Sequence, residues 1–122
     1  MSLYRDDGVV LRTWRLGEAD RIIDLLTAEH GKVRAVAKGV RKTRSKFGGR
    51  LEPTSHVAVQ LHRGRGDLDI VTQTETIDRF ESLRLDAERF ADASSLLEVI
   101  DVVAPDREPD RERYRMLVGA LR

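Results

Sequence analysis

Residues 32–38 and 55–63 alternate apolar and polar side chains, as β-strands with one buried face do. Residues 21–27 have a spacing that could also suit a helix, but this segment is short and bounded by turns, and residues 68–77 are rich in β-branched side chains. Five short segments in the first 80 residues are therefore predicted strands. They cover residues 9–14, 21–27, 32–38, 55–63 and 68–77. Turn sequences precede or separate several of them, among them Asp6-Asp7-Gly8, Glu29-His30-Gly31 and Gly64-Arg65-Gly66-Asp67. The pattern therefore predicts that the first two thirds of the chain are built from strands.

The period of the apolar positions changes after about Phe80. Residues 86–104, and those that follow Asp110, carry apolar side chains at helical spacing. Pro105 ends the first helical pattern, and Asp110 is a candidate N-cap for the second. The sequence stops within the second pattern, so we expect this chain to be the N-terminal portion of a longer protein whose remainder covers the helices.

The five predicted strands, with a short helical turn at residues 47–51 between the third and the fourth, match the order of the OB-fold. An SH3-like barrel is the structural alternative. We predict a mostly β protein with appended helices. A five-stranded OB-fold barrel that binds nucleic acid would occupy residues 1–80, and residues 81–122 would begin an incomplete helical domain.

The third predicted strand separates its side chains cleanly between two faces. One face carries Val33, Ala35 and Ala37, and the other carries Lys32, Arg34 and Lys38 together with Val36. On the first strand, Trp14 comes four residues after Val10, so both side chains should point to the same side of the strand. This spacing predicts that Trp14 lies partly in the core.

Other polar side chains receive structural interpretations. On the fourth predicted strand, Val57, Val59 and Leu61 should point inward, and His56, Gln60 and His62 outward. The two histidines lie roughly 20 Å apart, too far to bind one ion, so both are predicted to be exposed. Asp67 and Asp69 flank a hairpin end, where a role in the turn is expected. The charged residues of 81–122 are interpreted as a solvated helix surface.

The distribution of charge along the chain says more about function than the overall composition does. The chain of 122 residues has a formal net charge of only +1, yet residues 31–51 contain eight basic and no acidic side chains. We call this segment the basic window. It predicts a nucleic-acid-binding site, because a polyanion relieves the repulsion among its cations, and a solvated basic loop is the alternative. The candidate DNA-binding residues are Lys32, Arg34, Lys38, Arg41, Lys42, Arg44, Lys46 and Arg50.

Several classes of protein are disfavoured. The chain has no cysteine, which excludes a disulfide framework or a Cys-ligated zinc site within it. It shows no signal peptide and no apolar run of transmembrane length, so we expect a cytoplasmic protein without a membrane partner. It has neither a G-x-S-x-G nucleophile elbow nor a cysteine nucleophile, which favours a protein that is not an enzyme.

The stretch from Ala37 to Pro53, AKGVRKTRSKFGGRLEP, resembles the signature of the RecO recombination mediators. Residues 8–11 and 18–22 resemble the first two strands of that family, and residues 26–32 its first hairpin. The resemblance covers roughly residues 5–104 and implies a DNA-repair protein with an N-terminal OB-fold. It implies no cofactor in this chain, although many members carry a zinc site in the helical domain, which would lie beyond Arg122.

The resemblance also implies function and partners. Family members bind single- and double-stranded DNA, anneal complementary strands and help load RecA on DNA covered by single-strand-binding protein. RecR and single-strand-binding protein would be partners, with RecF and RecA acting indirectly. Because the chain is poor in aromatic residues, we expect a charge-led grip on the phosphate backbone rather than base readout.

Two alternatives remain open at this point. In the first, the barrel is a protein-interaction module that docks RecR, with the basic window against an acidic protein surface and little direct DNA binding. An OB-fold RNA-binding or translation factor rests on fold analogy alone.

Overall fold

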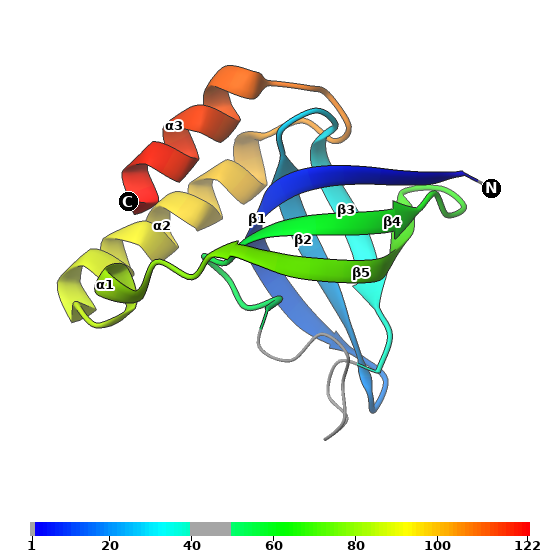
Figure 1. The fold of residues 1–122 in the computed structure, drawn as a ribbon, viewed down its shortest axis with the longest axis horizontal. Helices are drawn as coiled ribbons and strands as arrows, with labels where there is room; N and C mark the ends of the chain where they lie inside the picture. Colours follow the sequence, from blue (N-terminus) through cyan, green and yellow to red (C-terminus); the bar gives the residue numbers. More distant parts are fainter. Residues whose placement is uncertain (1, 40–49) are drawn as a thin grey trace.

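The computed structural model describes residues 2–39 and 50–122. This part of the chain forms β1 (Leu3–Leu16), β2 (Asp20–Thr27), β3 (Gly31–Ala37), β4 (His56–His62), β5 (Leu68–Asp78), α1 (Glu81–Arg84), α2 (Ala87–Val103) and α3 (Arg111–Leu121). The helices gather on one side of the strands (Figure 1).

The strands close into a barrel in the order β1-β2-β3-β5-β4. Neighbours are antiparallel except for β3 and β5, which pair in parallel. This is the topology of an OB-fold, in which closure leaves no unpaired strand edge. The predicted class, a mostly β barrel followed by helices, is confirmed.

Strand β1 is longer than predicted because it closes two edges of the barrel. Its first half pairs with β4 and its second half with β2. The turn expected at Asp6-Asp7-Gly8 is therefore wrong, since Asp7 pairs with Ala58 and Gly8 with Val57 inside the ladder. Glycine suits this crossing point, because a Cβ there would lie 3.2 Å from the carbonyl oxygen of Leu26.

The barrel interior holds the first apolar core. It contains Val10, Ile23, Leu25, Val33, Ala35, Ala37, Leu51, Val57, Val59, Leu61 and Val71. The inward positions predicted for β3 and β4 are confirmed, because alternation along a strand places every second side chain on the same face.

A second apolar core lies between the barrel and the helices. Val9, Leu11 and Leu26, on the outer side of the barrel, pack with residues of all three helices, among them Leu97 and Leu117. The expectation that the remainder of a longer protein covers the helices is therefore wrong for these faces, which the barrel covers. The predicted division into two domains near residue 80 stays a prediction, because the helices share this core with the barrel.

Both long helices begin at an aspartate N-cap. The carboxylate of Asp86 accepts a hydrogen bond from the backbone N–H of Arg89, and that of Asp110 accepts one from the N–H of Arg113. The candidate cap at Asp110 is confirmed. The helical turn expected at residues 47–51 lies largely outside the described residues, and Arg50 and Leu51 belong to a turn.

His56 is buried, contrary to its predicted exposure. The helices cover its strand face, where its ring stacks on Phe80 and its Nε2 lies 2.5 Å from the hydroxyl of Tyr114. Burial lowers the pKa of the His56 imidazole, so the neutral ring is the stable form here. Strand alternation identified the face of His56, but the partner on that face comes from a segment 58 residues away.

Candidate nucleic-acid interface

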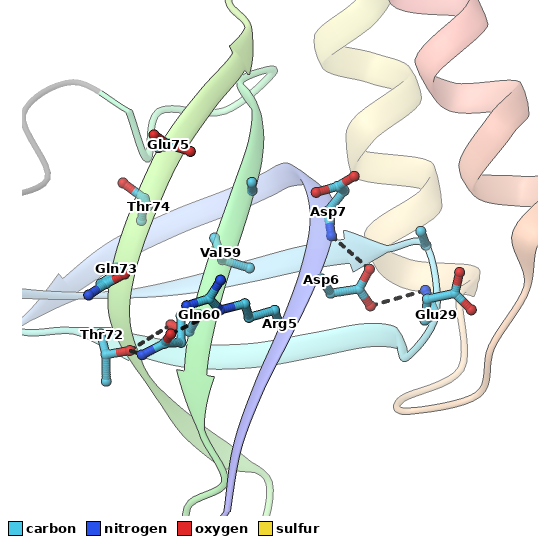
Figure 2. Close-up of a pocket in the computed structure, with 12 residues that line it drawn as sticks. Arg5, Asp6, Asp7, Glu29, Val59, Gln60, Thr72, Gln73, Thr74 and Glu75 are labelled. Atoms are coloured by element: carbon cyan, nitrogen blue, oxygen red, sulfur yellow. Dashed lines mark hydrogen bonds between the residues drawn. The ribbon is translucent and has the colours of Figure 1, made fainter.

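Two outer faces of the barrel differ in charge. The face formed by β1, β4 and β5 contains a hollow of about 610 Å³, which is drawn in Figure 2. Its charged lining residues are Asp6, Asp7, Glu29, Glu75 and a single cation, Arg5. A surface with this excess of carboxylates repels a phosphate backbone, which leaves the outer face of β1, β2 and β3 as the candidate for DNA.

Strand register shows what this second face presents. Two rows of side chains cross the three strands, Arg12–Asp24–Arg34 and Trp14–Ile22–Val36. We call these six residues the β1–β2–β3 face. Helix α2 packs at one end of the same side of the sheet, where Val9 and Leu26 join the second core. The two rows continue from that end toward the tip of the β1–β2 hairpin.

Trp14 lies on this face rather than in the core. The ladder between β1 and β2 shifts between Val10 and Arg12, which leaves Leu11 as an extra residue. One extra residue reverses the side to which each later side chain of β1 points. Val10 therefore points into the barrel, whereas Trp14 points outward. The predicted core position of Trp14 is therefore wrong.

Two guanidinium groups lie over the Trp14 ring. The Cζ atoms of Arg12 and Arg34 are each 4.8 Å from the ring centroid. This distance is within the range of cation–π attraction. Arg12 and Trp14 are not among the candidate residues that the sequence pattern indicates, and only the position of the bulge brings them together with Arg34.

Arg34 is held by a buried carboxylate. Its Nε and one terminal nitrogen donate to Asp24 at 2.8 and 3.2 Å, and Asp24 has no exposed surface. The hydrogen bonds to Asp24 raise the pKa of the Arg34 guanidinium above its ordinary value. Arg34 thus has a fixed position, but its charge is largely balanced within the protein.

Lys32 faces the helices rather than open solvent. Its ammonium donates to the backbone carbonyl of Asp101 at 2.5 Å and lies 3.9 Å from the Asp101 carboxylate and 3.6 Å from that of Asp106. Only 12% of the Lys32 side chain is exposed. Lys32 and Arg34 do share a strand side as predicted, but each is engaged by carboxylates.

The remaining candidate cations have different positions. Lys38 is exposed just after the end of β3, and Arg50 is exposed in the turn that begins the next described segment. Arg41, Lys42, Arg44 and Lys46 lie outside the described residues. Their assignment to a DNA site stays a prediction.

Asp101 on α2 connects the helices to this face. Burial and a hydrogen bond with the buried Asp24 raise its pKa to about 6, while Lys32 and Arg12 act in the opposite direction. The folded state therefore binds this proton more tightly than the unfolded chain does. As pH rises from about 4 to 6, ionisation of Asp101 removes stability from the folded state.

Asp101→Asn is expected to remove this loss of stability, because an amide stays neutral and can donate to Asp24. Urea unfolding at pH 4, 5, 6 and 7 measures the effect, with Asp92→Asn, an exposed position on the same helix, as the matched control. Relative to the control, the Asp101 variant should gain stability progressively between pH 4 and 7. Parallel pH profiles for the two variants would contradict the prediction.

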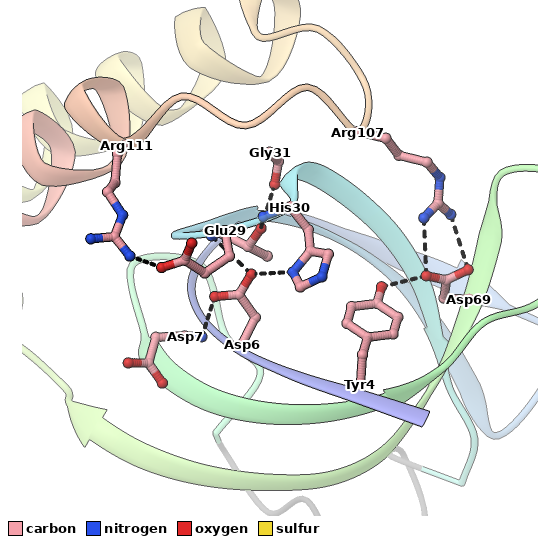
Figure 3. Close-up of polar contacts among 10 residues, drawn as sticks. Tyr4, Asp6, Asp7, Glu29, His30, Gly31, Asp69, Arg107 and Arg111 are labelled. Atoms are coloured by element: carbon pink, nitrogen blue, oxygen red, sulfur yellow. Dashed lines mark hydrogen bonds and ion pairs between the residues drawn. The ribbon is translucent and has the colours of Figure 1, made fainter. Parts of the chain in front are cut away.

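Polar contacts hold the segment between α2 and α3 on the barrel (Figure 3). Arg107 donates two hydrogen bonds to Asp69, at 3.1 and 3.0 Å, and Asp69 is fully buried. Asp69 also accepts from the Gly64 N–H, so the expected turn role is present but is only part of what it does. The interpretation of charges beyond residue 80 as a solvated surface is wrong for Arg107 and Asp101.

A second polar cluster lies at the β2–β3 turn (Figure 3). The buried carboxylate of Asp6 lies 2.6 Å from His30 Nδ1 and accepts a hydrogen bond from the Glu29 N–H. Arg111 at the start of α3 forms an ion pair with Glu29. The Asp6 contacts tie β1 to the β2–β3 turn, and the ion pair joins the start of α3 to the same turn.

No helix in the described ranges is long and apolar enough to cross a membrane. Within the same residues, no three histidine, aspartate or glutamate side chains are gathered as a metal ion would require.

The closed barrel carries on an outer face a hydrogen-bonded Arg34–Asp24 pair and two guanidinium groups over the Trp14 ring, and it defines a small OB-fold protein followed by helices. Residues 1–80 match the family described as "Recombination protein O N terminal". Over 122 aligned residues, which cover 98% of this chain, the sequence is 54% identical to a protein from Nocardioides sp. named DNA repair protein RecO. The chain belongs to the RecO family, and it spans about half the length of that relative.

Proposed function

We propose that this chain is the DNA-binding portion of a recombination mediator in DNA repair. It would bind single- and double-stranded DNA, anneal complementary strands and help load RecA on DNA covered by single-strand-binding protein. RecR and single-strand-binding protein would be its partners, with RecF and RecA acting indirectly. The proposal includes no catalytic step and no cofactor in this chain, and it places the protein in the cytoplasm at the nucleoid.

The proposal rests on the position at which the basic window begins on the barrel. It starts on β3, on the side of the sheet away from the acidic hollow, and within the described residues Lys38 is its first exposed cation without an ion pair. Lys32 and Arg34 are already engaged by carboxylates, so the phosphate contacts would fall mainly on Lys38 and the cations after it. Such contacts release condensed counterions and require no particular base sequence, which suits strand annealing.

Charge reversal of Arg41, Lys42 and Arg44 to glutamate tests this proposal. The expected result is weaker binding of a single strand and a salt slope that is shallower by about 2, since each phosphate contact contributes about 0.7. Fluorescence anisotropy of a labelled oligonucleotide at several salt concentrations measures both quantities.

The matched control makes the same change in net charge outside the window, with Arg65, Arg79 and Arg115 replaced by glutamate. All three side chains are exposed. If the window variant bound DNA as tightly as the control and with the same slope, the proposal would be overturned.

The acidic hollow supports a second role, docking of a protein partner. Its carboxylates and the hydrogen-bonded pair Arg5 and Gln60 form a polar surface apart from the β1–β2–β3 face. Charge reversal of the exposed hollow residues Asp7 and Glu75 to lysine should then weaken RecR binding while DNA affinity is retained. Loss of RecR binding in the window variant, with DNA affinity retained, would instead place the partner at the basic window.

A further inference from the structure

We propose that Trp14 is a stacking platform for an unpaired base of single-stranded DNA, flanked by a fixed Arg34 and an exchangeable Arg12. This inference rests on the proposed DNA binding and adds a base contact to a grip otherwise made by cations.

Arg34 supplies the fixed side of the platform. Its two hydrogen bonds to Asp24 hold the guanidinium in place, and its Cζ lies 4.8 Å from the ring centroid of Trp14. The Asp24 carboxylate is completely buried, whereas 47% of the Arg34 side chain stays exposed beside the ring. A preorganised ring costs little entropy when a base stacks on it.

Arg12 supplies the exchangeable side. It is exposed and lies at the same 4.8 Å distance from the ring centroid, but within the described residues it makes no hydrogen bond or close ion pair. An arriving base can take over its contact with the indole, and the freed guanidinium can then fork onto the adjacent phosphate. The base of the nucleotide would thus contact Trp14, and its phosphate would contact Arg12.

The position of Trp14 favours a ligand over a purely structural role. Trp14 belongs to neither apolar core, although tryptophan is usually among the side chains that contribute most to core packing. It lies in register with Val36, two residues before the exposed Lys38 where the basic window becomes available. Phosphates attracted to that window would bring their bases to the ring, and stacking accepts any base because every base has a π-face.

The chain contains one tryptophan, so its intrinsic fluorescence reports on this site alone. Titration with an oligothymidylate should quench or shift the emission in parallel with binding measured by anisotropy. An abasic oligonucleotide with the same number of phosphates should bind more weakly and leave the emission unchanged. A duplex, whose bases are already stacked on one another, should also leave it unchanged.

Trp14→Ala should weaken binding of the oligothymidylate by about 5- to 150-fold, the usual worth of one stacked base. Binding of the abasic strand should stay the same, and Trp14→Phe should restore most of the lost affinity. The wild-type fluorescence titration tests the inference even where a variant fails to fold.

The outcomes separate the two proposals. Binding of the oligothymidylate without any change in Trp14 emission, or an equal loss of affinity for both strands in Trp14→Ala, overturns the stacking site and leaves the proposed function intact. Absence of binding to either strand by anisotropy overturns the proposed function itself.

Discussion

Replacement of Asp69 by alanine is expected to lower the free energy of unfolding by about 3 kcal/mol. The carboxylate has no exposed surface and accepts hydrogen bonds from Arg107, Tyr4 and the Gly64 backbone. Its loss would leave the Arg107 guanidinium without its partner. Removal of one member of a buried pair costs about 3–5 kcal/mol, and the lower end applies because 21% of the Arg107 side chain is exposed.

Urea unfolding of the 122-residue chain, followed by the emission of its single tryptophan, measures this change. Asp67→Ala is the matched control, since Asp67 is exposed two residues away in the same hairpin. Its effect should stay within about 0.5 kcal/mol. An Asp69 variant no less stable than the Asp67 variant would show that the pair does not hold the α2–α3 segment on the barrel.

A double-mutant cycle with Arg107→Ala locates the effect. If the two side chains stabilise the protein through each other, the double variant should be more stable than the sum of the single losses predicts, by about 0.5–3 kcal/mol. Strict additivity would assign the loss to Tyr4 and the hairpin instead.

Gly31→Ala is expected to destabilise the protein by about 3 kcal/mol or more. Gly31 has a φ of 69°, and a left-handed backbone alone costs an L-residue about 1–2 kcal/mol. The added Cβ would also lie 2.2 Å from the backbone oxygen of Glu108, so the segment that carries Arg107 would have to move. That movement would strain the hydrogen bond from the Arg107 N–H to the Lys32 carbonyl, 2.9 Å long.

Gly66→Ala is the control for backbone conformation alone. Its φ is 62°, but no atom lies within 4 Å of an added Cβ. Urea unfolding of the two variants therefore separates the steric contact from the left-handed penalty, and only the Gly31 variant should exceed about 2 kcal/mol. Equal losses would mean that Glu108 moves away without cost.

Local patterns predicted the barrel well because burial on one face of a strand or helix repeats every few residues. The alternation in β3 identified Val33, Ala35 and Ala37 as interior, and Asp110 was recognised as a cap. Those signals depend only on neighbours within about one turn or one pleat.

The same patterns could not predict contacts between distant segments. Asp69 and Arg107 are 38 residues apart, and nothing in the sequence around either one indicates the other. Likewise, the sequence around Lys32 predicts an exposed surface cation. In the folded protein, α2 places the Asp101 carbonyl 2.5 Å from the Lys32 ammonium.

The sequence by itself determined the order of strands and helices, the interior of β3 and β4, and membership of a family through the stretch around the basic window. Only the tertiary structure decided what stands on the β1–β2–β3 face. A bulge of one residue between Val10 and Arg12 turned Trp14 outward, and strand pairing set Arg34 beside it. The physical reason is that side-chain parity follows from local periodicity, whereas register and ion pairing depend on which distant strands meet.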